Sequence, residues 1–255
     1  MNLVELKRSM TTLRLSGMAG SVETRILEAQ TDKMAPLDFA SALVSDELTR
    51  RSDRFIKRRL KQAEFRDPNK TLDAFDFDFN KKMNRRLLFE LATGQFVDRH
   101  EDALFLGPPG TGKSHIAQAL AHLAIRAGAE ARFTKTSRVL AHLAGGRADR
   151  TWDKRLAELT RPAVLLLDDF GMRELTAPQA DDLYELITER AGKSLILTSN
   201  RAPVDWYPLF PNPVVAESLL DRLINNSHQC FMNGPSYRPN KSPSRVVPTG
   251  NTSAS

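Results

Sequence analysis

The chain has 255 residues, enough for one sizeable hydrophobic core and a smaller appendage. Its 41% hydrophobic and 27% charged residues are typical of a soluble globular protein. The longest strictly apolar run, residues 163–167, is far too short to span a bilayer, and the first twenty residues lack the apolar segment of a signal peptide. The single cysteine, Cys230, excludes an internal disulfide and argues against a cysteine–histidine zinc site. These features indicate a cytoplasmic protein with no membrane partner.

Residues 1–66 are predicted to form a helical N-terminal domain for DNA binding or self-assembly. Apolar residues recur at three- and four-residue steps from Leu3 to Leu13, and the pattern resumes at Val22. A break is expected between Gly17 and Gly20.

A basic run dominates the second half of this domain. Residues 38–65 contain neither Gly nor Pro and are predicted to form one long helix. Between Arg50 and Arg66 there are eight Lys or Arg and two acids, and this excess equals the formal charge of +6 of the whole chain. Such a run either solvates a helix face or binds a polyanion, and the scarcity of opposing acids favours a nucleic-acid backbone. The candidate DNA-binding residues are Arg50, Arg51, Arg54, Lys57, Arg58, Arg59 and Lys61.

The segment 67–71 is predicted to be a turn between two domains, and 72–79 alternates apolar and acidic residues as an extended edge segment would. From there to Ser199, short apolar strands alternate with helices, which indicates an α/β fold with a parallel central sheet. The expected strands are 103–106, 131–134, 163–167 and 194–198. The expected helices are 114–127, 177–190 and 213–225, with Gly128, Thr176 and Asn212 at their ends. The second domain would span 67–238, and 239–255 reads as a disordered basic tail.

Residues 107–114, Gly-Pro-Pro-Gly-Thr-Gly-Lys-Ser, match the phosphate-loop pattern G-x-x-x-x-G-K-[ST]. The glycines permit backbone conformations in which successive amides point at a polyphosphate. Lys113 is expected to contact the β/γ-phosphates, and the Ser114 hydroxyl to ligate Mg²⁺. A strand before and a helix after the run support this interpretation over an ordinary surface turn. The candidate ATP-binding residues are Gly107, Pro108, Pro109, Gly110, Thr111, Gly112, Lys113, Ser114, His115 and, from farther along the chain, Arg238.

Two further strand ends carry polar side chains. The apolar run 163–167 ends in Asp168 and Asp169, and 194–198 leads to Asn200. Ligands of open parallel sheets bind at the carboxyl ends of the strands, so these residues are expected to meet the phosphate loop. Asp168 is a candidate Mg²⁺ ligand beside Ser114. Asp169 is a candidate for orienting or deprotonating an attacking water, and Asn200 for fixing that water or the γ-phosphate. Alternatively, the two carboxylates cap the turn that follows.

Two arginines near the end of the chain are either ordinary surface residues or parts of the site. Arg222 lies in Asp221-Arg222-Leu223, and Arg238 ends the run 234–238. An arginine from a neighbouring subunit can stabilise charge in the transition state of phosphoryl transfer.

Together these segments resemble an AAA+ ATPase, and more closely the IstB type of insertion-sequence helper ATPase, a relative of the DnaC helicase loader. The resemblance spans about residues 3–238. It rests on the basic run and residues 70–77, the phosphate loop, Leu167-Asp-Asp-Phe-Gly171, Thr198-Ser-Asn-Arg201 with Asp205-Trp206, Asp221-Arg-Leu223 and Ser236-Tyr-Arg238.

The resemblance implies roles for five kinds of element. Lys113 and Ser114 would be Walker A, Asp168 and Asp169 Walker B, Asn200 sensor 1, Arg222 an arginine finger acting in trans and Arg238 sensor 2. Proteins of this type assemble as homo-oligomers on duplex DNA with ATP and Mg²⁺, recruit a transposase and influence target choice. Two departures stand out. Most AAA+ proteins have Glu where Asp169 stands, and only 17 residues follow Arg238, so the C-terminal lid is expected to be reduced or absent.

Other functions remain open from the sequence. A helicase loader of the DnaC type would share the same machinery. A small-molecule kinase would need an arginine-bearing lid and an acceptor pocket, and a purely structural DNA-binding protein would have a degenerate phosphate loop. The complete loop and the Asn200 and Arg222 elements favour an ATPase over the kinase and the structural protein. The resemblance implies an ATPase that regulates transposition, which the sequence separates poorly from a helicase loader.

Overall fold

The structure is a computed structural model that describes residues 1–81 and 83–238. The chain divides into two compact units, Met1–Lys61 and the residues from Gln62 onward. The expected tail, 239–255, lies outside the described residues. No helix among the described residues is both long enough and apolar enough to cross a membrane.

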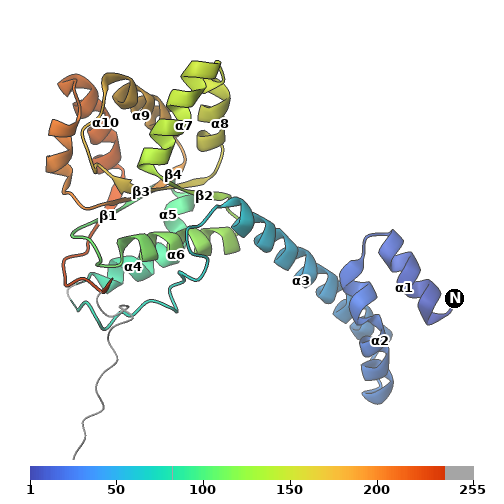
Figure 1. Ribbon diagram of the computed structural model, residues 1–255. Coiled ribbons are helices and arrows are strands. Elements are labelled where there is room, and N and C mark those ends of the chain that lie inside the picture. Colours follow the sequence, from blue (N-terminus) through green and yellow to red (C-terminus); the bar gives the residue numbers. More distant parts are fainter. Residues whose placement is uncertain (82, 239–255) are drawn as a thin grey trace, which may run out of the picture. The chain divides into compact units, whose positions relative to one another are not determined.

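The first unit is entirely helical, as predicted. Its helices are α1 (Leu3–Thr12), α2 (Ser16–Thr31) and α3 (Pro36–Gln62) (Figure 1). The α2 N-terminus is capped from α3, because the Glu47 carboxylate accepts hydrogen bonds from the amides of Gly17 (2.5 Å) and Met18 (3.2 Å). The expected break between Gly17 and Gly20 is wrong, since both residues lie inside α2. A Cβ on Gly17 would be 2.6 Å from the Glu47 Cα, so this glycine permits close packing of two helices.

The second unit contains a parallel five-stranded sheet of order β2-β3-β4-β1-β5. The four predicted strands are confirmed, each with slightly different ends, and a fifth follows them. Their bounds are β1 Asp102–Leu106, β2 Ala131–Lys135, β3 Val164–Phe170, β4 Ser194–Ser199 and β5 Ser227–Phe231. The edge strand β5 was not predicted because its sequence, Ser-His-Gln-Cys-Phe, lacks an apolar run.

Helices cover both faces of this sheet, so the unit has three layers (Figure 1). One face carries α4 (Arg85–Ala92), α5 (Gln95–Asp98) and α6 (Lys113–Arg126). The other carries α7 (Thr136–Asp149), α8 (Trp152–Thr160), α9 (Ala177–Glu189), the 3₁₀ helix η1 (Pro203–Leu209) and α10 (Pro213–Asn225). Helices α6, α9 and α10 match the predicted ones. Gly128 has φ 103° just beyond α6, and Asn212 Oδ1 accepts from the Val214 amide at the start of α10.

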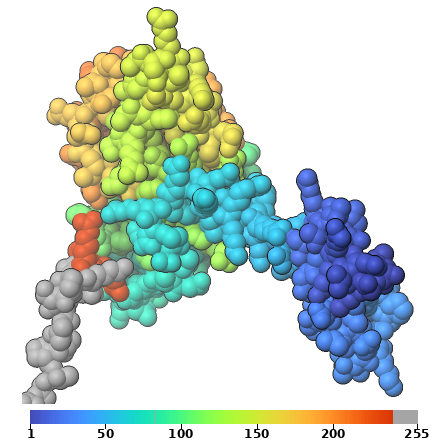
Figure 2. Space-filling model, turned by 45° about the vertical axis from the view of Figure 1, so that its right-hand side comes forward, coloured from blue at the N-terminus to red at the C-terminus, as the bar shows by residue number. Residues whose placement is uncertain are grey.

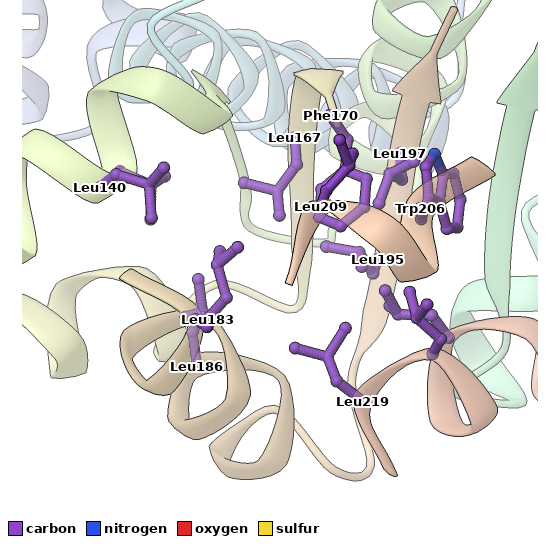
Figure 3. Packing of buried hydrophobic residues seen from close by; sticks show 14 of the residues in the cluster. Leu140, Leu167, Phe170, Leu183, Leu186, Leu195, Leu197, Trp206, Leu209 and Leu219 are labelled. Atoms are coloured by element: carbon purple, nitrogen blue, oxygen red, sulfur yellow. The ribbon is translucent and has the colours of Figure 1, made fainter. Parts of the chain in front are cut away.

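An apolar cluster of buried residues lies between the sheet and the layer formed by α7–α10. Leucines of β3 and β4 point toward those of α7, α9 and α10, with Leu209 and Trp206 from η1 beside them (Figure 3). Trp206 is fully buried, and its indole Nε1 donates to Ser199 Oγ at 3.1 Å. This core fixes β3 and β4, whose carboxyl ends carry the candidate site residues.

One segment differs from expectation. Residues 72–79 form bends and turns rather than an extended edge strand. Within residues 83–238 no α-helix follows β5, and the residues after 238, on which the expectation of a reduced lid also depends, lie outside the described part.

Candidate nucleotide-binding site

The phosphate loop connects β1 to α6 and has the backbone that its sequence predicts. Gly107, Gly110 and Gly112 have φ values of 140°, 84° and 95°, which side-chain-bearing residues rarely adopt. Helix α6 begins at Lys113, directly after the last glycine of the loop, and its dipole favours an anion at that end. Lys113 is buried, and its Nζ donates to the carbonyls of Gly107 and Pro108, both at 2.7 Å. Burial lowers the Lys113 pKa to about 8, although the nearby carboxylates of the β3 end oppose this shift.

The first carboxylate at the end of β3 faces the start of α6. Asp168 is buried, and its Oδ1 accepts hydrogen bonds from Ser114 Oγ and Thr198 Oγ1, both at 2.6 Å. Its Oδ2 is buried and has no hydrogen-bond partner among the described residues. An orphaned carboxylate oxygen beside a serine hydroxyl offers the hard oxygen ligands that Mg²⁺ prefers, so the residues present fit this ion.

The second carboxylate points elsewhere because β3 bulges at this position. The pairing of β3 with β4 shifts between Leu167 and Phe170, and Asp169 has φ 61°. The Asp169 amide donates to Thr198 Oγ1 at 3.1 Å, and its carboxylate forms an ion pair with Lys135 of β2 at 2.8 Å. The bulge therefore directs two adjacent carboxylates to different partners, Asp168 to Ser114 of α6 and Asp169 to Lys135 of β2.

Lys113, Ser114 and Asp169 line one cleft of about 570 Å³. The predicted residues Gly107, Pro108 and Asp168 are not part of its lining, although Asp168 is hydrogen-bonded to Ser114. Asn200 follows β4 and donates through Nδ2 to Met172 Sδ at 3.4 Å. Arg238 reaches the cleft from the segment after β5, close enough to oppose protonation of Lys113. The predicted site residues that line the cleft are Pro109, Gly110, Thr111, Gly112, Lys113, Ser114, His115, Asp169, Asn200 and Arg238.

Apart from Arg238, the sequence analysis did not place at the phosphate loop the two segments that border it. One comprises residues 66–80, which we call the linker segment, and the other residues 232–238, which we call the return segment. The end of the described chain, in red, borders the cyan linker segment in Figure 2. Phe79 packs edge-on against Tyr237, with ring centroids 4.8 Å apart. A Cβ on Gly112 would be 2.6 Å from the Phe75 ring, and one on Gly110 would be 2.0 Å from Ser236 Oγ.

The interactions of the linker segment extend to α6 and the cleft. His115 Nε2 lies 2.8 Å from the Thr71 carbonyl oxygen, and the His115 ring packs edge-on against Phe75. The alternation of Phe and Asp at 75–79, first interpreted as an edge strand, was the available signal. Its phenylalanines instead contact the loop, α6 and the return segment.

Arg222 does not lie at this cleft. It projects from α10, donates to Thr188 Oγ1 at 3.1 Å and lies over the Tyr184 ring. It lines a second cleft of about 470 Å³ that also includes Asp102 and Arg190. The structure therefore leaves Arg222 apart from Lys113 of the same chain.

The basic residues of α3 fall into two sets. Arg51 is tied to Glu47 by an ion pair of 2.7 Å, and the guanidinium groups of Arg58 and Arg59 lie over the Phe55 ring. The remaining four are exposed and share one side of the helix: Arg50, Arg54, Lys57 and Lys61.

Comparison with known proteins agrees with this geometry. The sequence model of the IstB-like ATP binding proteins matches residues 8–244. An ATP-binding protein of an insertion sequence from Mycobacterium tuberculosis is 53% identical over 244 residues, which cover 95% of this chain and 97% of that protein. The ATP-binding protein of the insertion sequence IS21 from Pseudomonas aeruginosa is 34% identical, covering 97% and 94%.

Solved structures share the fold. The crystal structure of the DnaC helicase loader superposes with a TM-score of 0.51 and 23% identity, covering 58% of this chain and 88% of that one. The parallel sheet between two helical layers, with the phosphate loop after β1, is thus the AAA+ P-loop fold. The chain belongs to the family of IstB-like ATP-binding proteins of insertion sequences.

Proposed function

We propose that the protein is a DNA-binding AAA+ ATPase that assembles on duplex DNA with ATP and regulates the transposase of an insertion sequence. One observation carries the proposal: the phosphate loop, the two carboxylates after β3, Asn200 and Arg238 converge on a single cleft or on its loop. The family of insertion-sequence ATP-binding proteins supports the nucleotide and the genetic setting.

In the proposed mechanism each side chain of the cleft has a separate task. Lys113 exchanges its two carbonyl partners for β/γ-phosphate oxygens, and the loop amides hold the remaining phosphate charge. Ser114 and Asp168 would hold Mg²⁺, which neutralises phosphate charge when bound. Asp169 accepts a proton from the attacking water or orients it, and Asn200 positions the same water. Arg238 contacts the phosphates from the return segment.

Hydrolysis is proposed to require a second subunit. Arg222 lies outside the cleft of its own chain, as an arginine finger supplied in trans would. The site would then be completed only in a homo-oligomer, and DNA would promote turnover by bringing subunits together.

Duplex DNA is proposed to contact the exposed basic side of α3. Arg50, Arg54, Lys57 and Lys61 lie within about one third of the helix circumference, so they can follow one phosphate backbone. The contacts are to phosphates, and the expected binding is independent of sequence.

A helicase loader remains the second candidate, because the DnaC loader shares the fold. The two functions differ in their partner. A transposase encoded in the same insertion sequence should bind the ATP-loaded protein on DNA, and a replicative helicase should not. Strand-transfer and helicase-loading assays with the purified partners test this directly.

The nucleotide site is tested by Lys113→Ala, with Lys154→Ala on exposed α8 as the control. Loss of the phosphate-binding charge should abolish binding of a fluorescent ATP analogue, and the control should bind normally. Unchanged ATP turnover in the Lys113 variant would refute the site.

The arginine finger is tested by mixing two inactive variants. Arg222→Ala should bind ATP without hydrolysing it, and Lys113→Ala should fail to bind. A mixture contains interfaces with an intact loop from one chain and an intact arginine from the other, so part of the activity should return. A mixture without activity would argue against a shared site.

The DNA surface is tested through salt dependence. Four phosphate contacts predict a slope of log K against log salt of about −3.6 on B-DNA, and Arg54→Ala should reduce its magnitude by about 0.9. The control Lys154→Ala should leave the slope unchanged. A slope that Arg54→Ala does not alter would remove this side of α3 from the proposed interface.

A further inference from the structure

Helix α3 exposes a line of large apolar side chains, and at the end of this line the guanidinium groups of Arg58 and Arg59 lie over the Phe55 ring. Leu37, Val44, Leu48 and Phe55 are 75%, 47%, 62% and 36% exposed. Their spacings of seven, four and seven residues place all four within about 40° of one another around the helix, because each residue advances about 100°. We call this line the α3 stripe. Soluble monomers rarely leave such a continuous line in water.

The four positions of the α3 stripe are spaced symmetrically about residue 46. Leu37 and Phe55 each stand nine positions from residue 46, and Val44 and Leu48 each stand two positions from it. A second α3 running in the opposite direction, aligned at residue 46, therefore places Leu37 against Phe55 of the second copy and Val44 against Leu48 of the second copy. A two-fold interface requires this reciprocity, in which residue i contacts j and j contacts i.

The residues beside the α3 stripe permit a second helix to approach α3 closely. Among the exposed residues that flank it, Ala40, Ser41, Ser45 and Ser52 are small, and the longer Arg51 side chain is held by its ion pair with Glu47. Small side chains flanking large ones leave room for the apolar residues of a second helix to interdigitate.

Charge along α3 selects the antiparallel arrangement. Residues 36–49 contain three acids and no base, whereas 50–62 contain seven bases and one acid. Asp46 and Glu47 already pair with Arg25 and Arg51, so an antiparallel pair is favoured mainly because it keeps the two basic halves apart and opposes the two helix dipoles. A parallel pair would bring the two basic halves together.

Pairing through the α3 stripe leaves the basic side available. Arg50, Arg54, Lys57 and Lys61 lie at least about 100° around the helix from the line of the stripe. A second copy and a polyanion can therefore occupy α3 at the same time.

From this geometry we infer that the α3 stripe is a docking face for a second copy of this chain, which binds antiparallel about a two-fold axis near residue 46. The interface is isologous and closes at two chains, unlike a shared nucleotide site, which repeats from subunit to subunit. It requires no nucleotide, so its test is independent of the proposed ATPase function.

Charge substitutions at the centre of the interface test the proposal in the full chain without nucleotide. Val44→Lys or Leu48→Glu alone should raise the dissociation constant of the pair on the order of 100-fold, because each buries an unpaired charge. In an equimolar mixture of the two variants, the new lysine faces the new glutamate and the other contact stays apolar, so pairing should return. Sedimentation equilibrium measures all three samples, and circular dichroism should show unchanged helix content, since both positions are exposed.

Cysteine cross-linking tests the direction of the helices, and the native Cys230 is buried and gives little background. A mixture of Leu37→Cys and Phe55→Cys chains should form a disulfide between them. Leu37→Cys alone should not, because the two copies of position 37 would be about 27 Å apart along an antiparallel pair. Self-linking of Leu37→Cys would overturn the antiparallel arrangement. A wild-type chain that stays monomeric up to about 100 µM would overturn the interface, since even a micromolar affinity would populate the pair there.

Discussion

Asp102 allows a quantitative test of how the core that supports the phosphate loop responds to pH. The residue begins β1, is buried, and accepts a hydrogen bond from the Leu195 amide of β4 at 2.7 Å. Burial raises the Asp102 pKa from 3.8 to about 7, and the hydrogen bond and the charge of Arg190 only partly oppose this shift. Asp102→Asn retains an oxygen for the Leu195 amide and removes the titration.

The direction in which stability changes with pH follows from the difference in proton binding between the folded and unfolded states. Between about pH 4 and pH 7 the folded protein holds a proton on Asp102 that the unfolded chain has lost. The contribution of this group to the free energy of unfolding is therefore fully present below pH 4 and is lost as the pH rises through 7. A shift of about three units corresponds to about 4 kcal/mol, which is an upper value for a group near the edge of the sheet.

Urea unfolding at pH 5 and pH 8 measures this difference. Both tryptophans, Trp152 and Trp206, belong to the second unit, so their fluorescence reports its unfolding. At pH 8 the Asp102→Asn variant should be the more stable by up to about 4 kcal/mol, a midpoint shift of roughly 1–4 M urea, and at pH 5 the gap should be much smaller. Asp153→Asn on the exposed surface of α8 is the control. An equal shift at both pH values would refute the reasoning.

Two further substitutions address the nucleotide site. The methyl group of Gly110→Ala would lie 2.0 Å from Ser236 Oγ, so nucleotide binding should weaken at least about tenfold, measured by titration with a fluorescent ATP analogue. Gly94→Ala, with a similar φ of 82° but open space around its Cβ, should bind nucleotide normally. Lys135→Met should raise DNA-independent phosphate release about two- to fivefold, because it frees the Asp169 carboxylate from a half-exposed ion pair. Slower release would show that Lys135 assists the reaction instead.

Much of the secondary structure of the second unit could be predicted because its local sequence patterns are compatible with few other structures. Apolar runs that lead into Gly-x-x-x-x-Gly-Lys-Ser or end in Asp identify β1 and β3 from local sequence alone, and the apolar run that ends in Thr-Ser-Asn indicates β4. Helix boundaries are hard to predict where a glycine lies inside a helix and permits close packing against a neighbouring segment. Gly17 was expected beside a break but allows α2 to approach α3, and Gly146 lies inside the unpredicted α7, where a Cβ would be 2.8 Å from the Trp152 Cα. Nothing in local sequence distinguishes such a glycine from a helix terminator.

The parts of the site that were missed depend on contacts distant in sequence. Lys135 meets Asp169 across 34 residues, and Phe79 meets Tyr237 across more than half the chain. Thr198 was read only as part of a strand, yet its hydroxyl joins Asp168 to the Asp169 amide. These contacts follow from strand order and from the course of the two segments around the loop, neither of which residue spacing specifies.

The return segment has a practical consequence for work with this protein. Its backbone is pinned to the end of β1 and to the phosphate loop, through Met232 N to Leu106 O at 2.7 Å and Tyr237 N to Gly110 O at 2.9 Å. Truncation just after β5, or a fusion partner joined at 232–238, would release the glycines of the loop from their neighbours. Expression designs and labelling sites should therefore keep this stretch intact, because a loss of ATP affinity in such a product would reflect the engineering rather than the native chain.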